Sequence, residues 1–307
     1  MRQAVTFYKF VPVNDHQALR APLFERGQAL QLKGSILLAE EGVNGTLVGS
    51  QENLEQITHT LQQYFGPMTF KWSDIDPENE GFYRLKVKLK QEIVTLGVAD
   101  LDMSLTGEHV DVMRWNELLE DPDVVVIDTR NQYEIDIGTF PGAVSPGTEN
   151  FRDFPAWVAE NLDAENPPPV AMFCTGGIRC EKASAYMRQH GFDEVYQLDG
   201  GVLNYLEHAA EDENRWQGEC FVFDQRVSVT ADLRQGRYQQ CYACRHPLSD
   251  EDRQSELYEP GVRCPHCADL KVNRERFAQR QKQIALSAAR GEAHIGQSQK
   301  EKRSDGR

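Results

Sequence analysis

A short glycine-bearing segment in the second half of the chain carries the residues best suited to chemistry. Cys174, Gly176, Gly177, Arg179 and Cys180 lie within seven consecutive positions. The segment follows an apolar run that predicts a buried strand, and it precedes a stretch that predicts a helix. Such a turn directs backbone N–H groups and the positive end of the helix dipole inward, where they favour an anion. This field lowers the pKa of a thiol, and the arginine adds a fixed positive charge. The sequence therefore predicts an activated cysteine in an anion-binding loop.

The length of this loop indicates which chemical group it can hold beside the cysteine. Arg179 stands five positions after Cys174, one residue closer than in the Cys-x5-Arg loop of phosphatases, which is sized for a phosphate. The tighter loop suits the outer sulfur of a persulfide. Cys180 is a second candidate, because the first turn of the following helix would also acidify its thiol. It could resolve a bond to Cys174, carry sulfur itself or be the reactive residue, and the spacing alone leaves these roles open.

Four further cysteines form a separate pattern. Cys241 and Cys244 make one Cys-x2-Cys pair, and Cys264 and Cys267 make another, with nineteen residues between the pairs. Each pair can present two thiolates to one tetrahedral ion, so the spacing predicts a zinc site. A set of disulfides is the alternative. Because four sulfur ligands leave no open position, the predicted zinc is structural rather than catalytic.

The composition is that of a folded chain with an acidic body and a basic end. The chain has 307 residues, of which 40% are apolar and 26% are charged, as in an ordinary globular protein of two or more domains. A net charge of −15 argues against broad nonspecific binding to nucleic acid. Residues 268–307, however, hold ten Lys and Arg against five Asp and Glu, a net of +5 that can contact phosphates locally.

We expect a cytoplasmic protein without a membrane partner. The first residues predict a strand and lack the apolar region of a signal peptide. No stretch approaches the roughly 20 apolar residues of a membrane span. The two cysteine patterns also fit a reducing compartment, where thiols persist.

The first 95 residues predict a separate N-terminal domain. Asn14 is expected to cap a helix at 15–32 that Pro22 kinks or splits, and Ser50 to cap a second helix. Residues 41–45 predict a turn, since two glycines and an asparagine fall there. The order strand–helix–strand–strand–helix–strand is that of a ferredoxin-like sandwich, an α+β fold. The predicted strands lie at 5–11, 35–39, 45–48, 69–72 and 83–89.

The central region predicts a second domain of the α/β class. Apolar strands alternate there with helices, which favours a mostly parallel sheet with the reactive loop at the carboxyl end of a strand. Asp128 and Arg130 follow another strand, and we expect them to brace the loop through an ion pair. An ordinary structural salt bridge is the alternative. The expected divisions are a connector at 96–120 that includes a helix at 111–119, the α/β domain at 121–215, a cysteine-rich segment at 216–275, and a tail at 276–307 that is helical and then disordered.

Three segments of the central region resemble the rhodanese family. They are residues 124–143, the loop at 174–180 and residues 192–201, in the order that the family has them. The resemblance implies a rhodanese-like domain in which Cys174, the positional match to the family's cysteine, carries a persulfide.

The order of all the parts resembles the bacterial tRNA uridine hydroxylase family over nearly all of residues 1–270. The matching segments are residues 39–45, 174–183 and 221–227, followed by the cysteine pairs. The resemblance implies oxygen-dependent hydroxylation of the wobble uridine, at anticodon position 34, to 5-hydroxyuridine. Dioxygen would be the co-substrate, an unidentified donor would supply electrons, and the partner would be the anticodon loop of tRNA. We expect the N-terminal domain and the basic segment 271–282 to contact its phosphates.

Other functions fit parts of the sequence. The loop by itself is equally typical of a sulfurtransferase that carries a cysteine persulfide, but such an enzyme needs neither the N-terminal domain nor the cysteine pairs. The loop keeps both Cys174 and Arg179, which argues against the function of a noncatalytic binding protein. The short loop disfavours a phosphatase.

Overall fold

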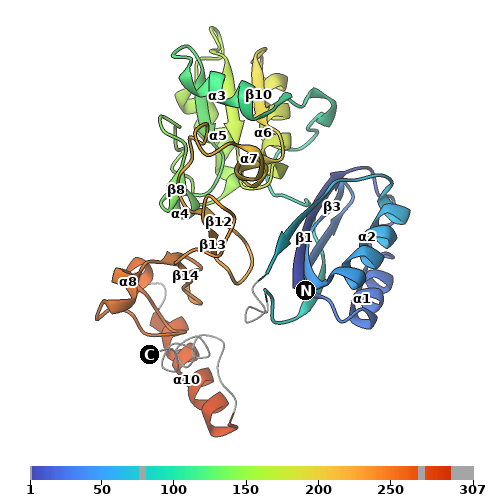
Figure 1. The fold of residues 1–307 in the computed structure, drawn as a ribbon, viewed down its shortest axis with the longest axis vertical. Coiled ribbons are helices and arrows are strands. Elements are labelled where there is room, and N and C mark those ends of the chain that lie inside the picture. Colours follow the sequence, from blue (N-terminus) through green and yellow to red (C-terminus); the bar gives the residue numbers. More distant parts are fainter. Residues whose placement is uncertain (1, 76–80, 269–273, 292–307) are drawn as a thin grey trace. The chain divides into compact units, whose positions relative to one another are not determined.

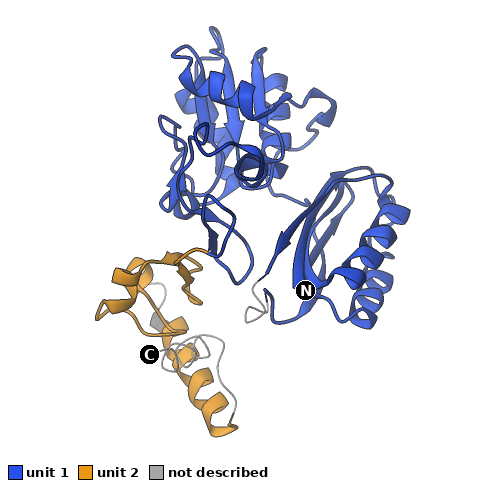
Figure 2. Ribbon diagram, in the orientation of Figure 1, with its two compact units in different colours: residues 1–235 blue, residues 236–307 orange. Residues whose placement is uncertain are grey.

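The computed structural model describes residues 2–75, 81–268 and 274–291. The chain divides into two compact units, residues 1–235 and residues 236–307 (Figure 2). Within the described ranges, no helix combines the length and the apolar character needed to cross a membrane.

The first unit begins with a five-stranded sheet whose strand order is β4-β1-β3-β2-β5. Strand β5 runs parallel to β2, and the other neighbours are antiparallel. Helices α1 and α2 cover one face of this sheet (Figure 1), where Val5, Phe7 and Ile57 are buried in a common core. This arrangement confirms the expected ferredoxin-like sandwich. Its elements are β1 (Arg2–Phe10), α1 (Arg20–Ala29), β2 (Lys33–Ala39), β3 (Gly42–Ser50), α2 (Gln51–Phe65), β4 (Phe70–Asp74) and β5 (Leu85–Leu89).

Two local predictions for this domain were wrong. Helix α1 begins at Arg20 rather than at residue 15, because Pro22 is accommodated in the first helical turn, where no backbone donor is lost. The glycines of the predicted turn instead lie in β3, and the reversal is made at residues 40–41. Gly45 faces the ring of Phe7 across the sheet, and a Cβ there would come within 2.7 Å of that ring, so a strand glycine is needed. Ser50 caps α2 as expected, accepting from the Asn53 N–H.

The second part of this unit is a parallel four-stranded sheet of order β6-β10-β9-β7. The side chains of its central strand β9 alternate, since Phe173 packs with α3 and α7 on one face while Met172 packs with α5 and α6 on the other. The predicted α/β sheet is therefore confirmed. Its elements are β6 (Glu108–Val110), α3 (Val112–Glu120), β7 (Val125–Asp128), α4 (Gln132–Ile135), β8 (Gly138–Thr139), α5 (Phe154–Asn161), β9 (Val170–Phe173), α6 (Ile178–Gln189), β10 (Val195–Leu198) and α7 (Gly201–His208).

Short strands follow, of which β11 (Gln217–Gly218) pairs with β8 and β12 (Cys220–Phe221) pairs with β13 (Ser228–Val229). The second compact unit is small and holds β14 (Gln239–Gln240), β15 (Pro247–Leu248), α8 (Asp250–Gln254), α9 (Pro265–Ala268) and α10 (Arg274–Ala289). Its buried core consists of Leu248 and three cysteines. The predicted borders at residues 95, 120, 215 and 275 stay predictions, and residues 292–307 of the predicted tail lie outside the described residues.

Candidate active site

The cysteine loop occupies the carboxyl end of β9, as expected. Cys174 is buried, and its Sγ accepts a hydrogen bond from the Gly177 N–H at 3.1 Å. Gly177 caps α6 with a φ of +97°, a conformation that favours glycine, and a Cβ there would lie 2.9 Å from the Tyr8 hydroxyl. The positive φ and the nearby Tyr8 hydroxyl therefore both require a glycine at position 177.

The turn before α7 holds the loop from its other side. The Val202 N–H donates to the Cys174 carbonyl at 2.9 Å, and the Leu203 N–H donates to the Thr175 carbonyl at 3.1 Å. Gly201 has a φ of +68°, and a Cβ there would come within 2.4 Å of the Cys174 carbonyl. The segment at 192–201, one of the three that resemble the rhodanese family, thus ends in the turn that fixes the backbone of Cys174.

The two loop cysteines have opposite electrostatic environments. Burial raises the pKa of Cys174, but hydrogen bonding from Cys180, the charge of Arg179 and backbone N–H groups lower it overall, to about 6. Burial raises the pKa of Cys180 well above its ordinary value, and the hydrogen bond and charge of Cys174 raise it further. Thr129 contacts the Cys180 sulfur at 3.6 Å. This arrangement favours a thiolate at Cys174 and a protonated donor at Cys180.

Arg179 is held by a carboxylate to which the sequence analysis assigned no role. Its guanidinium donates to both carboxylate oxygens of Glu134, at 2.8 and 2.9 Å, and both side chains are buried. Glu134 also accepts from the Asn131 N–H in the capping box of α4. Two signals in the sequence point to Glu134: the capping box, and its place in the segment 124–143 that resembles the rhodanese family.

Asp128 and Arg130 form the predicted ion pair. The two hydrogen bonds are 2.8 and 2.6 Å long, and both side chains are fully buried. Arg130 also donates to the Gly138 carbonyl at 2.6 Å and lies over the ring of Trp216. These partners connect the end of β7 to β8. Their bracing of the cysteine loop therefore stays a prediction.

A cavity of about 440 Å³ opens beside the cysteine loop. Cys174, Gly176 and Arg179 line one side of it, and the sheet face of the N-terminal domain that α1 and α2 leave open lines the other. Polar side chains from that face are Thr6, Tyr8, Ser35, Asn44, Thr46 and Lys71. A third wall includes Phe223, whose ring lies over the Arg179 guanidinium and is 57% exposed. Nothing in the type or spacing of these N-terminal residues indicates that they belong to the site.

Side chains at the start of helix α6, directly after the cysteine loop, bond to the N-terminal domain. The Tyr8 hydroxyl donates to Glu181 at 3.0 Å. Lys182 is buried and pairs with Glu41 at 2.7 Å and with Glu92 at 2.5 Å. The open face of the N-terminal sheet is thereby held against the residues that follow the reactive cysteine.

The second unit brings the four predicted ligand cysteines together. The sulfurs of Cys241, Cys244, Cys264 and Cys267 all lie within 4.8 Å of one another, and Cys264 is 3.7 Å from Cys244 and 3.8 Å from Cys267. Zinc bound to four thiolates at about 2.3 Å requires sulfur–sulfur separations of about 3.8 Å. The arrangement therefore fits a tetrahedral metal.

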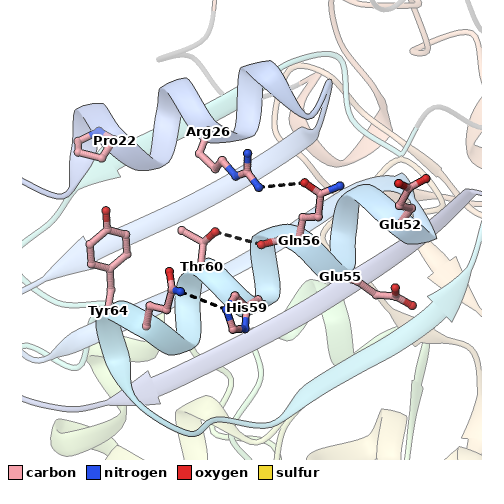
Figure 3. A pocket seen from close by; sticks show the side chains of 9 residues that line it. Pro22, Arg26, Glu52, Glu55, Gln56, His59, Thr60 and Tyr64 are labelled. Atoms are coloured by element: carbon pink, nitrogen blue, oxygen red, sulfur yellow. Dashed lines mark hydrogen bonds between the residues drawn. The ribbon is translucent and has the colours of Figure 1, made fainter.

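A separate hollow of about 700 Å³ lies between α1 and α2 on the outer side of the N-terminal domain (Figure 3). Its polar side chains bond to one another, since Arg26 donates to Gln56 at 2.9 Å and Gln63 contacts His59 at 3.1 Å. None of the residues that line it is a cysteine. We therefore place the candidate active site at the cavity beside Cys174.

Comparisons with known proteins identify the same two domains. Residues 2–93 match the family model of the UPF0176 acylphosphatase-like domain, and residues 114–208 match that of the rhodanese-like domain. Solved structures that resemble parts of the chain include a rhodanese-like domain from Anabaena sp., 18% identical over 37% of this chain and 80% of that one, with a TM-score of 0.31. Another is an acylphosphatase from Bacillus subtilis, 15% identical over 29% of this chain and 99% of that one, with a TM-score of 0.24.

One curated relative matches nearly the whole chain. The tRNA uridine(34) hydroxylase of Teredinibacter turnerae is 50% identical over 292 residues, which is 94% of this chain and 91% of the relative. The match is long enough to include both domains of the first unit and the cysteine cluster of the second. The chain therefore belongs to the tRNA uridine(34) hydroxylase family.

Proposed function

We propose that this protein hydroxylates the wobble uridine of tRNA at C5 in a dioxygen-dependent reaction, at the cavity beside Cys174. The observation that carries the proposal is a cysteine, with its pKa lowered to about 6 by the loop, at the wall of a cavity of about 440 Å³. This volume falls within the range of about 300 to 1,000 Å³ that is usual for small-ligand sites and suits one flipped-out nucleotide. The 50% identity to a tRNA uridine(34) hydroxylase supports the same substrate.

Cys174 acts as a nucleophile in this proposal. Its thiolate adds to C6 of the uracil and makes C5 electron-rich, so that C5 reacts with dioxygen. One oxygen atom stays on C5 and the other leaves as water, which consumes two protons and two electrons from an external donor of the thiol class. Loss of the C5 proton and of the thiolate restores the ring. The enzyme is then an oxidoreductase that incorporates oxygen.

The alternative of sulfur transfer is not favoured. The match to the hydroxylase covers 94% of the chain, including the N-terminal domain and the cysteine cluster that sulfur transfer does not require. The N-terminal domain also provides a wall of the cavity at Cys174. A persulfide on Cys174 stays a prediction.

The partner in this proposal is the anticodon loop, a single-stranded region whose bases can leave the stack. Because tRNA is a cytoplasmic substrate, we place the protein in the cytoplasm. The basic segment at 271–282 remains the proposed phosphate contact. Residues 271–273 lie outside the described residues, whereas Arg276, Arg280 and Lys282 belong to α10.

Nucleoside mass spectrometry tests the proposed reaction. In a strain that lacks this gene and any redundant pathway, 5-hydroxyuridine and nucleosides derived from it are expected to disappear from tRNA. Re-expression of the wild-type chain should restore them. Unchanged 5-oxygenated uridines in the deletion strain would refute the hydroxylase.

We also propose that the four clustered cysteines hold one structural zinc ion. Cys241, Cys244, Cys264 and Cys267 would bind it as thiolates, and the ion would cross-link a unit with a very small apolar core. His246 and His266 stack on each other with ring centroids 3.7 Å apart, and neither is among the four clustered ligands.

Substitution of Cys241 by serine is expected to reduce bound zinc from about one ion per chain to nearly none, because three thiolates hold the ion far more weakly than four. The same variant should become sensitive to proteolysis within residues 236–268. Elemental analysis of purified protein and limited proteolysis provide the two measurements. Cys220→Ser is the matched control, since Cys220 is a buried free thiol of the first unit. Equal zinc contents in both variants would exclude the proposed site.

A further inference from the structure

Arg179 lowers the pKa of the Cys174 thiol, but its charge is shared with a carboxylate. Its guanidinium is bound through two hydrogen bonds to the buried carboxylate of Glu134. The negative charge of that carboxylate offsets part of the guanidinium's attraction for a thiolate. Burial meanwhile disfavours the anionic form of the sulfur. An additional unpaired cation would therefore have a large effect here.

Lys71 occupies the position where such a cation is needed. It projects from β4 of the N-terminal domain, and its Nζ donates to the Gly176 carbonyl at 3.3 Å and also to the Gly200 carbonyl. Gly176 belongs to the cysteine loop, and Gly200 belongs to the turn that fixes the Cys174 backbone. Lys71 and Cys174 line the same cavity. The ammonium group thus joins the two turns that enclose the sulfur.

The partners of Lys71 leave its charge available to the sulfur. Both hydrogen-bond acceptors are neutral carbonyl oxygens, and among the described residues no carboxylate is bonded to it as Glu134 is to Arg179. Burial lowers the pKa of Lys71 below its ordinary value, and the negative charges of Cys174, Asp199 and Glu207 offset part of this lowering. Among these charges, the sulfur of Cys174 has the largest effect.

We infer that Lys71 is a positioning residue of the candidate active site, and that its ammonium group keeps Cys174 in the thiolate form. The N-terminal domain would then contribute to the reactivity of the cysteine as well as to the cavity wall. This inference rests on the proposed role of Cys174 and does not depend on which substrate the thiolate attacks.

Several other groups act on the same sulfur, and the test must hold them constant. Arg179 and Cys180 face it from α6, and Tyr8 faces it from β1. Cys220 from β12 also interacts with its charge. Three carboxylates affect the sulfur indirectly. Glu134 acts through Arg179, whereas Asp199 and Glu207 act through Lys71. Only Lys71 is changed in the test below.

The test is the pH dependence of Cys174 alkylation by iodoacetamide in the full-length protein without tRNA, with the modified peptide identified by mass spectrometry. In the wild type, the rate should rise with pH and reach half its maximum near about pH 6, because the thiolate is the reactive form. Lys71→Met should move this midpoint upward by about one unit. The alkylation rate at about pH 5 then falls about tenfold, since below both midpoints one unit of pKa is tenfold in thiolate.

Lys71→Arg keeps the charge and should restore most of the wild-type profile. Lys9→Met is the matched control, because Lys9 is another lysine of the same sheet that donates to a backbone carbonyl, that of Pro67, and it does not line the cavity. Lys71→Gln replaces Lys71→Met if thermal unfolding shows that the methionine variant is not folded. A purely structural role would change the maximal rate but leave the midpoint in place.

An unshifted midpoint in a folded neutral variant overturns the inference, as does an equal shift in Lys71→Arg. Hydroxylation is assayed separately on the same proteins. A shifted midpoint in a chain whose wild type does not hydroxylate tRNA would refute the proposed function alone, and an unshifted midpoint in a chain that does hydroxylate tRNA would refute this inference alone.

Discussion

Substitution of Cys174 by serine is expected to abolish hydroxylation of tRNA, lowering the single-turnover rate by at least about a thousandfold, as is usual when a nucleophile is removed. A serine hydroxyl at this position stays protonated at neutral pH, whereas the loop lowers the pKa of the Cys174 thiol to about 6. The measurement is formation of 5-hydroxyuridine on unmodified tRNA by purified protein under dioxygen, with a thiol reductant as the electron donor.

Cys180→Ser is the matched variant, because it changes the neighbouring thiol in the same loop by the same atom. Cys180 is buried and its pKa is raised, so it serves as a hydrogen-bond donor in our proposal. A hydroxyl can still donate, and we expect the rate to fall by only about tenfold, the effect of weakening one hydrogen bond by roughly 1 to 1.5 kcal/mol. If Cys180→Ser were inactive and Cys174→Ser active, the roles of the two thiols would be exchanged. If both variants bind tRNA as tightly as the wild type does, a lower rate does not come from a binding defect.

The largest expected effect on stability is that of Asp128→Ala. Asp128 accepts two hydrogen bonds from Arg130, and both side chains are fully buried, so the variant leaves a buried guanidinium without its counter-charge. The free energy of unfolding of the rhodanese-like domain should fall by about 3 to 5 kcal/mol. Denaturant unfolding followed by tryptophan fluorescence measures this, because Trp115 and Trp216 are buried in the same core cluster as Phe173.

Asp232→Ala is the control for this prediction. Asp232 pairs with Arg234, also two residues away, but these side chains are 57% and 84% exposed, so water screens the pair and its loss should change stability little. The double variant Asp128→Leu with Arg130→Met removes both charges and should recover most of the lost stability. A cost for Asp128→Ala no larger than that for Asp232→Ala would contradict the expectation.

The features that the sequence predicted correctly are those encoded within short stretches of chain. The cysteine loop is seven consecutive residues, and its buried strand and following helix are visible in the apolar pattern around it. The capping of α2 by Ser50 follows from local side-chain chemistry. The predicted start of α1 was wrong because the helical pattern extends through residues 15–19, which form turns and no α-helix.

The missed parts of the site depend on contacts between distant positions. Glu134 and Arg179 are 45 residues apart, Lys71 and Gly176 are 105 apart, and Tyr8 and Glu181 are 173 apart. Nothing in the type or spacing of a lone lysine in a strand indicates which loop of another domain it will reach. The cluster of four cysteines was predictable because each half of it is a Cys-x2-Cys pair.

The bonds that join α6 to the N-terminal domain also limit which fragments of the chain can keep the cysteine loop intact. Tyr8, Glu41 and Glu92 all bond to the pair Glu181 and Lys182, directly after the reactive loop. A rhodanese-like fragment that begins at β6 would leave Lys182 without either carboxylate and would open the sulfur to bulk water. The fragment would also lack the N-terminal residues that line the cavity beside Cys174. In the intact chain, the shape of the space in front of the sulfur therefore depends on both domains.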